Sequence, residues 1–244
     1  RPPPAVAPAV LVERAPPERI GPYRLTALLG EGGMSQVFLA QRDDGLFEHD
    51  VAIKLMRAEG LAPLEAFFER ERRILARLRH PHIAQLFDGG LDEQGSPYFV
   101  MERLTGRGID DYCADHGLTA RDTVRLALQV CAAVQFAHQN LIVHADLKPT
   151  NVIVDDFGQA KLLDFGIARS LGEAAAPLTA RPMTLAYASP SLREGLPPEV
   201  ADDIYALGWL LHDLLVRRRP EDAPRDKAAL ALGALDADLR AVIA

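Results

Sequence analysis

Four polar side chains between residues 143 and 166 have the types needed to hold a metal ion and phosphate groups. They are Asp146, Lys148, Asn151 and Asp164, and they are set between apolar runs. Amide and carboxylate oxygens suit a hard divalent cation such as Mg²⁺, which commonly shares its ligand sphere with phosphates. The pattern therefore predicts a site for a metal and a phosphorylated ligand, provided that the fold brings these side chains together.

A β-hairpin is expected to bring two of them together. Residues 152–154 and 161–163 are strand-like, and residues 155–158 are typical of the turn between them. Because the ends of so short a hairpin meet, Asn151 before the first strand should lie close to Asp164 after the second. The plainer alternative is a polar turn in an unrelated mixed α/β protein.

The same residues resemble two motifs of eukaryotic-like protein kinases. The sequence HADLKPTN at 144–151 is similar to the H-R-D-L-K-x-x-N catalytic loop, and DFG at 164–166 is similar to the D-F-G motif. One tripeptide is a weak signal, but the two motifs at this spacing are specific. The sequence of residues 20–244 as a whole resembles the sequences of bacterial serine/threonine kinases, often proteobacterial ones.

The resemblance implies a role for each of the four polar side chains. Asp146 would accept the proton of the substrate hydroxyl or orient that hydroxyl, and Lys148 would contact the γ-phosphate. Asn151 and Asp164 would hold Mg²⁺, with Mn²⁺ as the alternative metal. The implied cofactors are therefore ATP and a divalent cation.

A glycine-rich segment and the strand that follows it are expected to cradle the nucleotide. The segment GEGGMS at 30–35 lies between strand-like residues 23–29 and 36–41, and glycine lets backbone N–H groups approach phosphate oxygens closely. The sequence VAIK at 51–54 matches the family's V-A-I-K strand, which implies that Lys54 orients the phosphates. The alternative for Lys54 is a snorkelling lysine at the end of a strand.

An amphipathic helix is predicted over residues 63–79, because apolar side chains recur there at helical spacing. The resemblance makes Glu71 of this helix the partner of Lys54, with the neighbouring Glu69 as the other candidate. A solvated charged helix face is the plainer interpretation of these glutamates.

The nucleotide site is completed by a hinge. Residues 86–91 and 97–101 are strand-like, and the resemblance makes Met101 the gatekeeper and residues 102–104 the hinge whose backbone holds adenine. The residues implied to contact the nucleotide are Leu29, Gly30, Gly32, Gly33, Val37, Ala52, Lys54, Met101, Glu102, Leu104 and Ile153.

Two long helices are predicted in the second half of the chain. The first covers residues 119–140 with Thr119 as N-cap. The second covers residues 202–216 and is apolar nearly all round, as in a buried helix. The resemblance implies that Asp203 holds the catalytic-loop backbone, whereas a surface N-cap is the alternative and would suit Asp202 better. The predicted apolar stripe of the first helix is Val124, Leu128, Cys131, Val134 and His138.

Several residues depart from the family's pattern. Ala145 replaces an arginine that pairs with a phosphorylated activation segment, so the chain resembles a non-RD variant that does not depend on that contact. Ser35 stands where a third glycine is usual, and Ser191 stands where the A-P-E motif has glutamate. Residues 167–188 resemble an activation segment, in which Thr184 matches a threonine typical of the serine/threonine type.

Composition excludes several classes of function. The net charge of −7 argues against nucleic acid or an anionic membrane as a main partner. The two cysteines, Cys113 and Cys131, are far apart, which fits a reducing cytosol. No run of about 18 apolar residues is present. Because the sequence begins with Arg1, we expect an excerpt of a longer protein, and a membrane anchor outside it is left open.

The expected fold is α+β, with the two lobes of a protein kinase. Residues 1–19, rich in Pro and Ala, are expected to form a disordered linker. Residues 20–101 would form a small N-lobe with an antiparallel sheet and the helix that carries Glu71. Residues 102–244 would form the hinge and a larger, mainly helical C-lobe that is truncated at its C-terminal end.

The expected activity is transfer of the γ-phosphoryl group of Mg–ATP to a Ser or Thr hydroxyl of a protein, in the cytoplasm. Two alternatives are kept. The first is a catalytically weak pseudokinase that acts as a nucleotide-binding scaffold, motivated by Ala145, Ser35 and Ser191. The second is an aminoglycoside-type small-molecule kinase, in which a small residue such as Ala145 is common, although Lys148 favours protein substrates. Dimerisation is left open.

Overall fold

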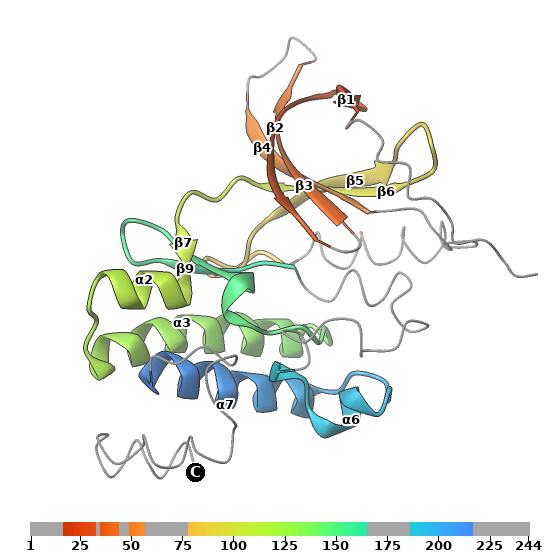
Figure 1. The fold of residues 1–244 in the computed structure, drawn as a ribbon. Helices are drawn as coiled ribbons and strands as arrows, with labels where there is room; N and C mark the ends of the chain where they lie inside the picture. The colour runs from red at the N-terminus through yellow and green to blue at the C-terminus, as the bar shows by residue number, and fades with distance from the viewer. Residues whose placement is uncertain (1–16, 33–34, 44–48, 57–77, 165–185, 217–244) are drawn as a thin grey trace, which may run out of the picture.

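The chain folds into a curled antiparallel sheet that lies above a mainly helical part (Figure 1). The computed structural model describes residues 17–32, 35–43, 49–56, 78–164 and 186–216. The α+β class and the two-part arrangement predicted from the sequence are confirmed.

The upper part is a six-stranded sheet with strand order β1-β2-β3-β4-β6-β5. Each neighbouring pair is antiparallel. The strands predicted on either side of the glycine-rich segment, and those at 86–91 and 97–101, are confirmed, most of them a residue or two longer. The strands are β1 (Arg19–Ile20), β2 (Tyr23–Glu31), β3 (Ser35–Arg42), β4 (Asp50–Met56), β5 (Leu86–Leu91) and β6 (Pro97–Glu102).

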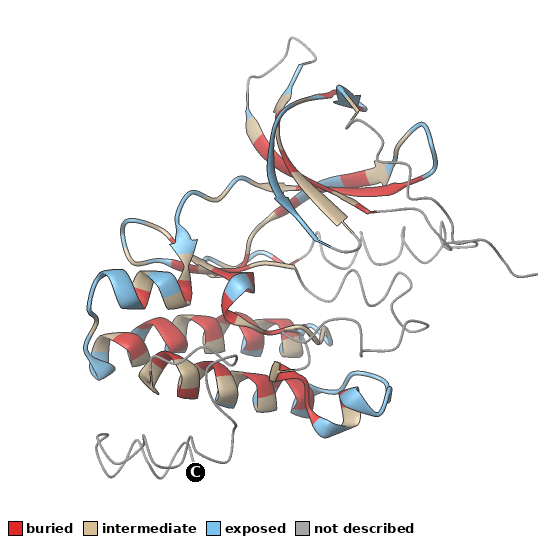
Figure 2. Ribbon diagram, in the orientation of Figure 1, coloured by how far each residue is buried: buried red, intermediate tan, exposed pale blue. Residues whose placement is uncertain are grey.

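The two faces of this sheet pack against different cores, because successive side chains of a strand point to opposite faces. Ile53 of β4 and Val100 of β6 belong to a small cluster within the upper part. On the other face, Met56 and Phe99 belong to a larger cluster that continues into the helices. Figure 2 shows buried stretches in the central strands of the upper sheet and along the helices of the lower part.

The lower part contains a small second sheet and the helices. The sheet has strand order β7-β8-β9, and its β8–β9 hairpin packs on α3, which in turn contacts α7. The elements are β7 (Arg107–Gly108), α2 (Ile109–Asp115), α3 (Ala120–Gln139), the 3₁₀ turn η1 (Pro149–Asn151), β8 (Val152–Val154), β9 (Ala160–Leu162), α6 (Pro190–Arg193) and α7 (Val200–Val216).

Helix α3 begins where the sequence predicts and for the predicted reason. The Thr119 hydroxyl accepts the backbone N–H of Asp122 at 3.2 Å and donates to the Asp122 carboxylate at 2.6 Å. This pair of bonds satisfies one of the N–H groups that a helix start leaves without a partner and puts a negative charge near its N-terminus. The prediction of a cap at Thr119 is therefore confirmed.

The predicted apolar stripe of α3 is only partly correct. Val134 is buried as expected, but Leu128, another predicted member, is 60% exposed. The wide buried face is rich in small residues, which allow α7 and the hairpin to approach closely on two sides. The residues that α3 buries are Thr123, Leu126, Ala127, Val130, Ala133, Val134 and Ala137.

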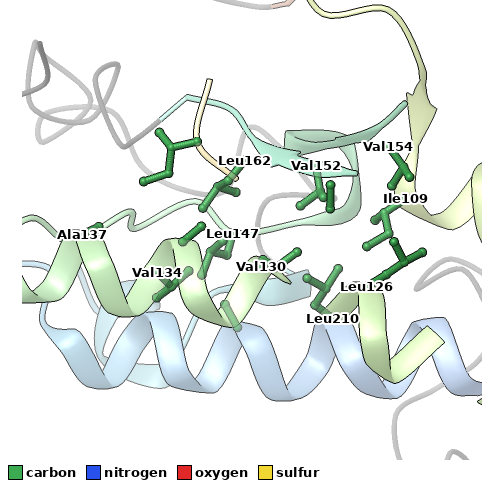
Figure 3. Close-up of a cluster of buried hydrophobic side chains, with 14 of the residues drawn as sticks. Ile109, Leu126, Val130, Val134, Ala137, Leu147, Val152, Val154, Leu162 and Leu210 are labelled. Atoms are coloured by element: carbon green, nitrogen blue, oxygen red, sulfur yellow. The ribbon is translucent and has the colours of Figure 1, made fainter. Parts of the chain in front are cut away.

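One apolar layer joins the lower elements and holds the loop before η1. Figure 3 shows Leu147 between Leu162 of the hairpin and Val130 of α3, with Leu210 of α7 beneath. Leu147 is 1% exposed. The loop that carries Asp146 and Lys148 is therefore anchored in the core by the residue between them.

Some expectations fall on residues that lie outside the described ones. They are the linker at its residues 1–16, the helix at 63–79 up to residue 77, and the segment 167–188 up to residue 185. Leu78 and Arg79, the last two residues of the predicted helix, are not helical. In the part of the chain that the structure describes, no helix is both long and apolar enough to cross a membrane.

Candidate active site

An ion pair connects the two parts of the molecule. The Nζ atom of Lys54 on β4 lies 3.0 Å from Oδ2 of Asp164, which follows β9. The lysine side chain is 9% exposed and the aspartate 26%. Because a nearly buried ammonium is costly without a partner, this carboxylate is an important part of what holds Lys54 in place. Two residues more than a hundred positions apart in sequence thus meet at one point, as the sequence predicts.

The face of the sheet that carries Lys54 also carries other residues expected near the nucleotide. Val37 of β3 is directly opposite Lys54, and Ala52 of β4 is opposite Met101 of β6. Opposite residues of an antiparallel pair point to the same face, as do residues two apart on one strand. Val37, Ala52, Lys54 and Met101 therefore share one face, the face that meets the larger core.

The hairpin places Asn151 beside the residues around Asp164. Strands β8 and β9 are paired as predicted, although β9 begins and ends one residue earlier than expected. The backbone N–H of Leu163 donates to the carbonyl of Asn151 at 2.8 Å. The two ends of the hairpin are adjacent, which confirms the predicted closeness of Asn151 to the start of the D-F-G sequence.

Asp146 and its neighbours form a compact polar cluster. Nζ of Lys148 lies 2.7 Å from Oδ2 of Asp146. Nδ2 of Asn151 donates to the backbone carbonyl of Asp146 at 2.8 Å and to its Oδ2 at 3.3 Å. With the amide nitrogen of Asn151 used in this way, its oxygen remains the atom suited to bind a cation.

His144 connects this loop to Leu163, the residue between β9 and Asp164. Its Nε2 lies 2.7 Å from the carbonyl of Leu163, and the backbone N–H of Asp146 donates to its Nδ1 at 3.2 Å. These partners require the neutral ring with its proton on Nε2. Burial lowers the pKa of His144, and the nearby Asp203 carboxylate opposes this only in part. The ring therefore stays neutral and keeps both contacts.

Asp203 on α7 holds the loop from the other side. Its carboxylate accepts the backbone N–H groups of His144 and Ala145, each at 2.8 Å. The side chain is 1% exposed, and Nε2 of His138 lies 2.7 Å away. The predicted contact between Asp203 and the loop backbone is confirmed. The part played by His138 was not predicted, because α7 is far from it in sequence.

Two residues at the site have left-handed backbone conformations without being glycine. Ala145 has φ 62° and Asp164 has φ 53°. Such a conformation costs roughly 1 kcal/mol or more for a residue with a Cβ atom. The contacts from Asp203 to Ala145 and from Lys54 to Asp164 offset this cost. These contacts therefore hold both residues in the left-handed conformation.

The hinge is fixed by a side chain whose partners were not predicted. Oε1 of Glu102 lies 2.5 Å from Nζ of Lys161 on β9, and its Oε2 accepts the backbone N–H of Gln85 at 3.3 Å. Glu102 also donates its own N–H to the Gln85 carbonyl at 2.8 Å. By contrast, the backbone N–H and C=O of Leu104 have no hydrogen-bond partner among the described residues. They are thus available to a planar ligand such as adenine.

The glycine-rich segment has room for phosphate groups. The N–H of Gly32 donates to the Ser35 carbonyl at 2.8 Å, which closes the turn. Among the described residues, a Cβ atom added at Gly30 would meet nothing within 4 Å. The packing of these residues therefore does not require glycine there, whereas close approach of a phosphate would.

The donors present suit a metal that is shared with phosphates. Among the described residues, no group of three or more His, Cys, Asp or Glu side chains could hold a metal alone. Asn151 and Asp164 supply one amide oxygen and one carboxylate at the adjacent ends of the hairpin. Mg²⁺ commonly has one or two protein carboxylates and completes its shell with phosphate and water oxygens, so the site fits a Mg²⁺–nucleotide complex.

Some predicted site residues add less or lie outside the described residues. Leu29 is 54% exposed on β2, and Ile153 is partly buried on β8, opposite Lys161. Gly33 and Glu71 lie outside the described residues. Asp164 is a partner of Lys54 among the described residues, and the contact between Lys54 and Glu71 stays a prediction.

Comparison with known proteins gives relatives that are protein kinases. A family model described as "Protein kinase domain" matches residues 23–236. The probable serine/threonine-protein kinase PknB of Corynebacterium glutamicum is 36% identical over 208 residues, 81% of this chain and 32% of its own length. The serine/threonine-protein kinase PrkC of Bacillus subtilis is 35% identical over 222 residues, 89% of this chain and 34% of its own. The chain thus spans about a third of these relatives.

A crystal structure of the Mycobacterium tuberculosis PknI kinase domain has a similar fold. The TM-score is 0.71 at 25% sequence identity, and the match covers 98% of this chain and 92% of that one. The sheet, the helices and the loops between them are therefore arranged as in a known kinase domain.

Proposed function

The chain belongs to the protein kinase domain family, and from this premise we propose that it transfers the γ-phosphoryl group of Mg²⁺–ATP to a Ser or Thr hydroxyl of a protein. Kinases of this family use ATP and a divalent metal. The observation that supports the proposal best is the 3.0 Å ion pair between Lys54 and Asp164, because it joins a phosphate-orienting cation to a metal-binding carboxylate.

Each polar residue has a task in this reaction. Lys54 orients the phosphates from the sheet, and the carboxylate of Asp146 orients the attacking hydroxyl. Lys148, 2.7 Å from Asp146, offsets the charge that develops as the γ-phosphoryl group moves. Asn151 and Asp164 would hold Mg²⁺, which when bound neutralises phosphate charge. Catalysis of this kind relies on positioning and electrostatics and not on covalent chemistry of the protein.

The remaining site residues serve nucleotide binding in this proposal. Val37, Ala52 and Met101 share the sheet face of Lys54 and would contact the adenine ring. The backbone of Glu102 and Leu104 would bind the adenine edge. Glu71 would support Lys54 from the helix predicted at 63–79, and Mn²⁺ would serve as the alternative metal.

Ala145 has a consequence for regulation. Its backbone N–H is held by Asp203 at 2.8 Å, but its methyl side chain offers no charge to a phosphorylated segment. The proposed kinase is therefore of the non-RD kind, and its basal rate does not depend on phosphate binding at position 145. Phosphorylation of Ser170 or Thr179 should then change the rate less than about tenfold.

Phosphate transfer from radiolabelled ATP tests this function. The unmodified chain should label itself or a histone preparation in a Mg²⁺-dependent manner, and Asp146→Asn should lower that rate by at least about 10²-fold. Signal no higher than that of Asp146→Asn would favour a scaffold. Transfer to an aminoglycoside without transfer to protein would favour a small-molecule kinase.

The division of the chain follows from the same proposal. Residues 20–101 would act as the nucleotide-binding lobe, residues 102–244 as the hinge and substrate-binding lobe, and residues 1–19 as a linker. The proposed location of this part of the protein is the cytoplasm, where ATP and protein substrates are found.

A further inference from the structure

Two adjacent carboxylates in the first turn of α7 hold two different segments of the chain. Asp203 accepts the backbone N–H groups of the catalytic loop. Asp202 accepts the hydroxyl of Ser191 at 2.7 Å and the hydroxyl of Ser189 at the same oxygen, Oδ1. Successive residues of a helix point about 100° apart, so one turn of α7 faces both segments.

The carboxylate of Asp202 is held firmly in this position. Its second oxygen accepts the backbone N–H of Glu199 at 2.7 Å, as the third residue of a helix often does towards the residue before the helix. Asp202 is 3% exposed. The Ser189 hydroxyl in turn caps α6 by accepting the N–H of Leu192 at 3.1 Å. Asp202 is thus buried, with both oxygens in use, so the alternative of a surface N-cap, which suited Asp202 better than Asp203, does not apply.

The same segment is fixed to α7 at a second point. The hydroxyl of Tyr187 donates to Oδ2 of Asp213 at 2.8 Å. Asp202 and Asp213 are eleven residues apart in α7, which is about three turns, so both lie on one face of the helix. Residues 187–191 therefore run along this face, and the two carboxylates set their position.

This arrangement differs from the family's pattern in a specific way. The A-P-E motif has a glutamate where this chain has Ser191, so the motif here supplies a hydroxyl. The carboxylate comes instead from Asp202 on α7, next to the residue that holds the catalytic loop. The distance between the end of the activation-like segment and Asp146 is consequently set by one helical turn.

We propose that Asp202 is a positioning residue that fixes residues 187–191, the end of the activation-like segment, relative to the catalytic loop through Ser189 and Ser191, so that this segment can bind the protein substrate. This inference rests on the proposed kinase function. Misplacing a bound reactant by a small distance costs rate steeply, so loosening residues 187–191 weakens productive binding of the protein substrate. Nucleotide binding, which uses Lys54 and the hinge, is unaffected.

Kinetics with two substrates test the proposal. Asp202→Asn keeps the shape of the side chain but loses an acceptor, and it should raise KM for a histone substrate by about tenfold. KM for ATP and the rate of ATP hydrolysis without protein should change less than twofold. Glu199→Gln is the matched control, because it removes an equal charge from an exposed side chain on a nearby residue and should leave both KM values unchanged.

A milder variant keeps the test valid if Asp202→Asn folds poorly. Ser191→Ala leaves α7 and the Ser189 cap of α6 intact, removes one of the two hydroxyls that Asp202 accepts, and should raise the same KM. In both variants, amide hydrogen exchange should become faster at residues 186–193 and not at 143–151. An unchanged KM for histone, or an equal rise in KM for histone and in KM for ATP, would overturn the proposal. If the proposed kinase function itself is wrong, the unmodified chain will transfer no phosphate, and this outcome differs from any change in KM.

Discussion

Lys54 carries a charge that is nearly buried at the base of the large sheet. Its side chain is 9% exposed and lies 3.0 Å from Asp164. Such a pair adds little to the free energy of unfolding, because the cost of desolvating two charges offsets much of their attraction. The pair is therefore better explained by ligand binding than by stability, because a bound phosphate and metal would use both charges.

Replacing Lys54 with methionine tests this explanation. The variant keeps most of the apolar stem and removes the cation, so kcat/KM for ATP should fall by about 10²–10³-fold. Steady-state kinetics measure the loss. Arg24→Met serves as control because it removes an exposed positive charge from β2 and should change kcat/KM by less than twofold. A loss of less than threefold in Lys54→Met would contradict the assigned role.

The neutral, buried ring of His144 predicts how stability depends on pH. Burial lowers the pKa of His144 in the folded protein from about 6.5 in the unfolded chain. Below pH of about 6.5 the unfolded chain binds a proton that the folded protein does not, so stability falls as the pH drops. The slope is at most about 1.4 kcal/mol per pH unit for this group, until the folded pKa is reached.

Thermal unfolding between pH 7.5 and 5.5 measures this dependence. His144→Phe should be less stable at pH 7.5 by about 1–3 kcal/mol, because it leaves the Leu163 carbonyl and the Asp146 N–H without partners. Its stability should nevertheless fall less with decreasing pH than that of the unmodified chain. The exposed His116 provides the control, as His116→Phe should retain the full slope. Equal slopes for all three proteins would refute the account.

At the scale of elements, the sequence predicted correctly those features that depend on neighbouring residues only, such as turns, strand alternation and helix caps. The hairpin at 152–154 and 160–162 was predicted to within one residue, because its turn and its alternating strands are both local features. The start of α3 was predicted from Thr119 as the N-cap before Asp122, which are again local features. The buried face of α3 was not, since it depends on where α7 and β9 lie, and those contacts are absent from the helix sequence.

The contact between the hinge and β9 predicts a coupling between two elements. Lys161 and Glu102 are partly buried, with 26% and 29% exposed side chains. Lys161→Met should raise KM for ATP about two- to fivefold with a smaller change in kcat, because the hinge backbone loses a support. The ion pair should contribute about 0.5–1 kcal/mol to the free energy of unfolding, as partly exposed ion pairs do.

A double-mutant cycle with Glu102→Gln isolates this pair. If the pair acts as a unit, the double variant should resemble either single variant in KM for ATP. Fully additive effects of Lys161→Met and Glu102→Gln would show that the two side chains act independently.

At the scale of the whole molecule, the site is built from elements far apart in sequence. The motifs named the residues, but their convergence depends on how the sheet sits over the helices. The contacts that join the two parts include those of Lys54 with Asp164 and of Glu102 with Lys161. The contact of Lys161 with Glu102 joins residues 59 positions apart, and that of Asp202 with Ser191 joins two separate helices, so the pattern within one element predicts neither. These side-chain contacts between elements could not be predicted from the sequence.

The central claim is that side chains from both parts of the molecule meet on one Mg²⁺–nucleotide complex. A crystal structure with Mg²⁺ and a nonhydrolysable ATP analogue tests it directly. We predict the triphosphate between Gly30 and Lys54, with oxygens of Asn151 and Asp164 about 2.1 Å from the metal. A nucleotide bound elsewhere, or a metal that neither Asn151 nor Asp164 contacts, would contradict the account.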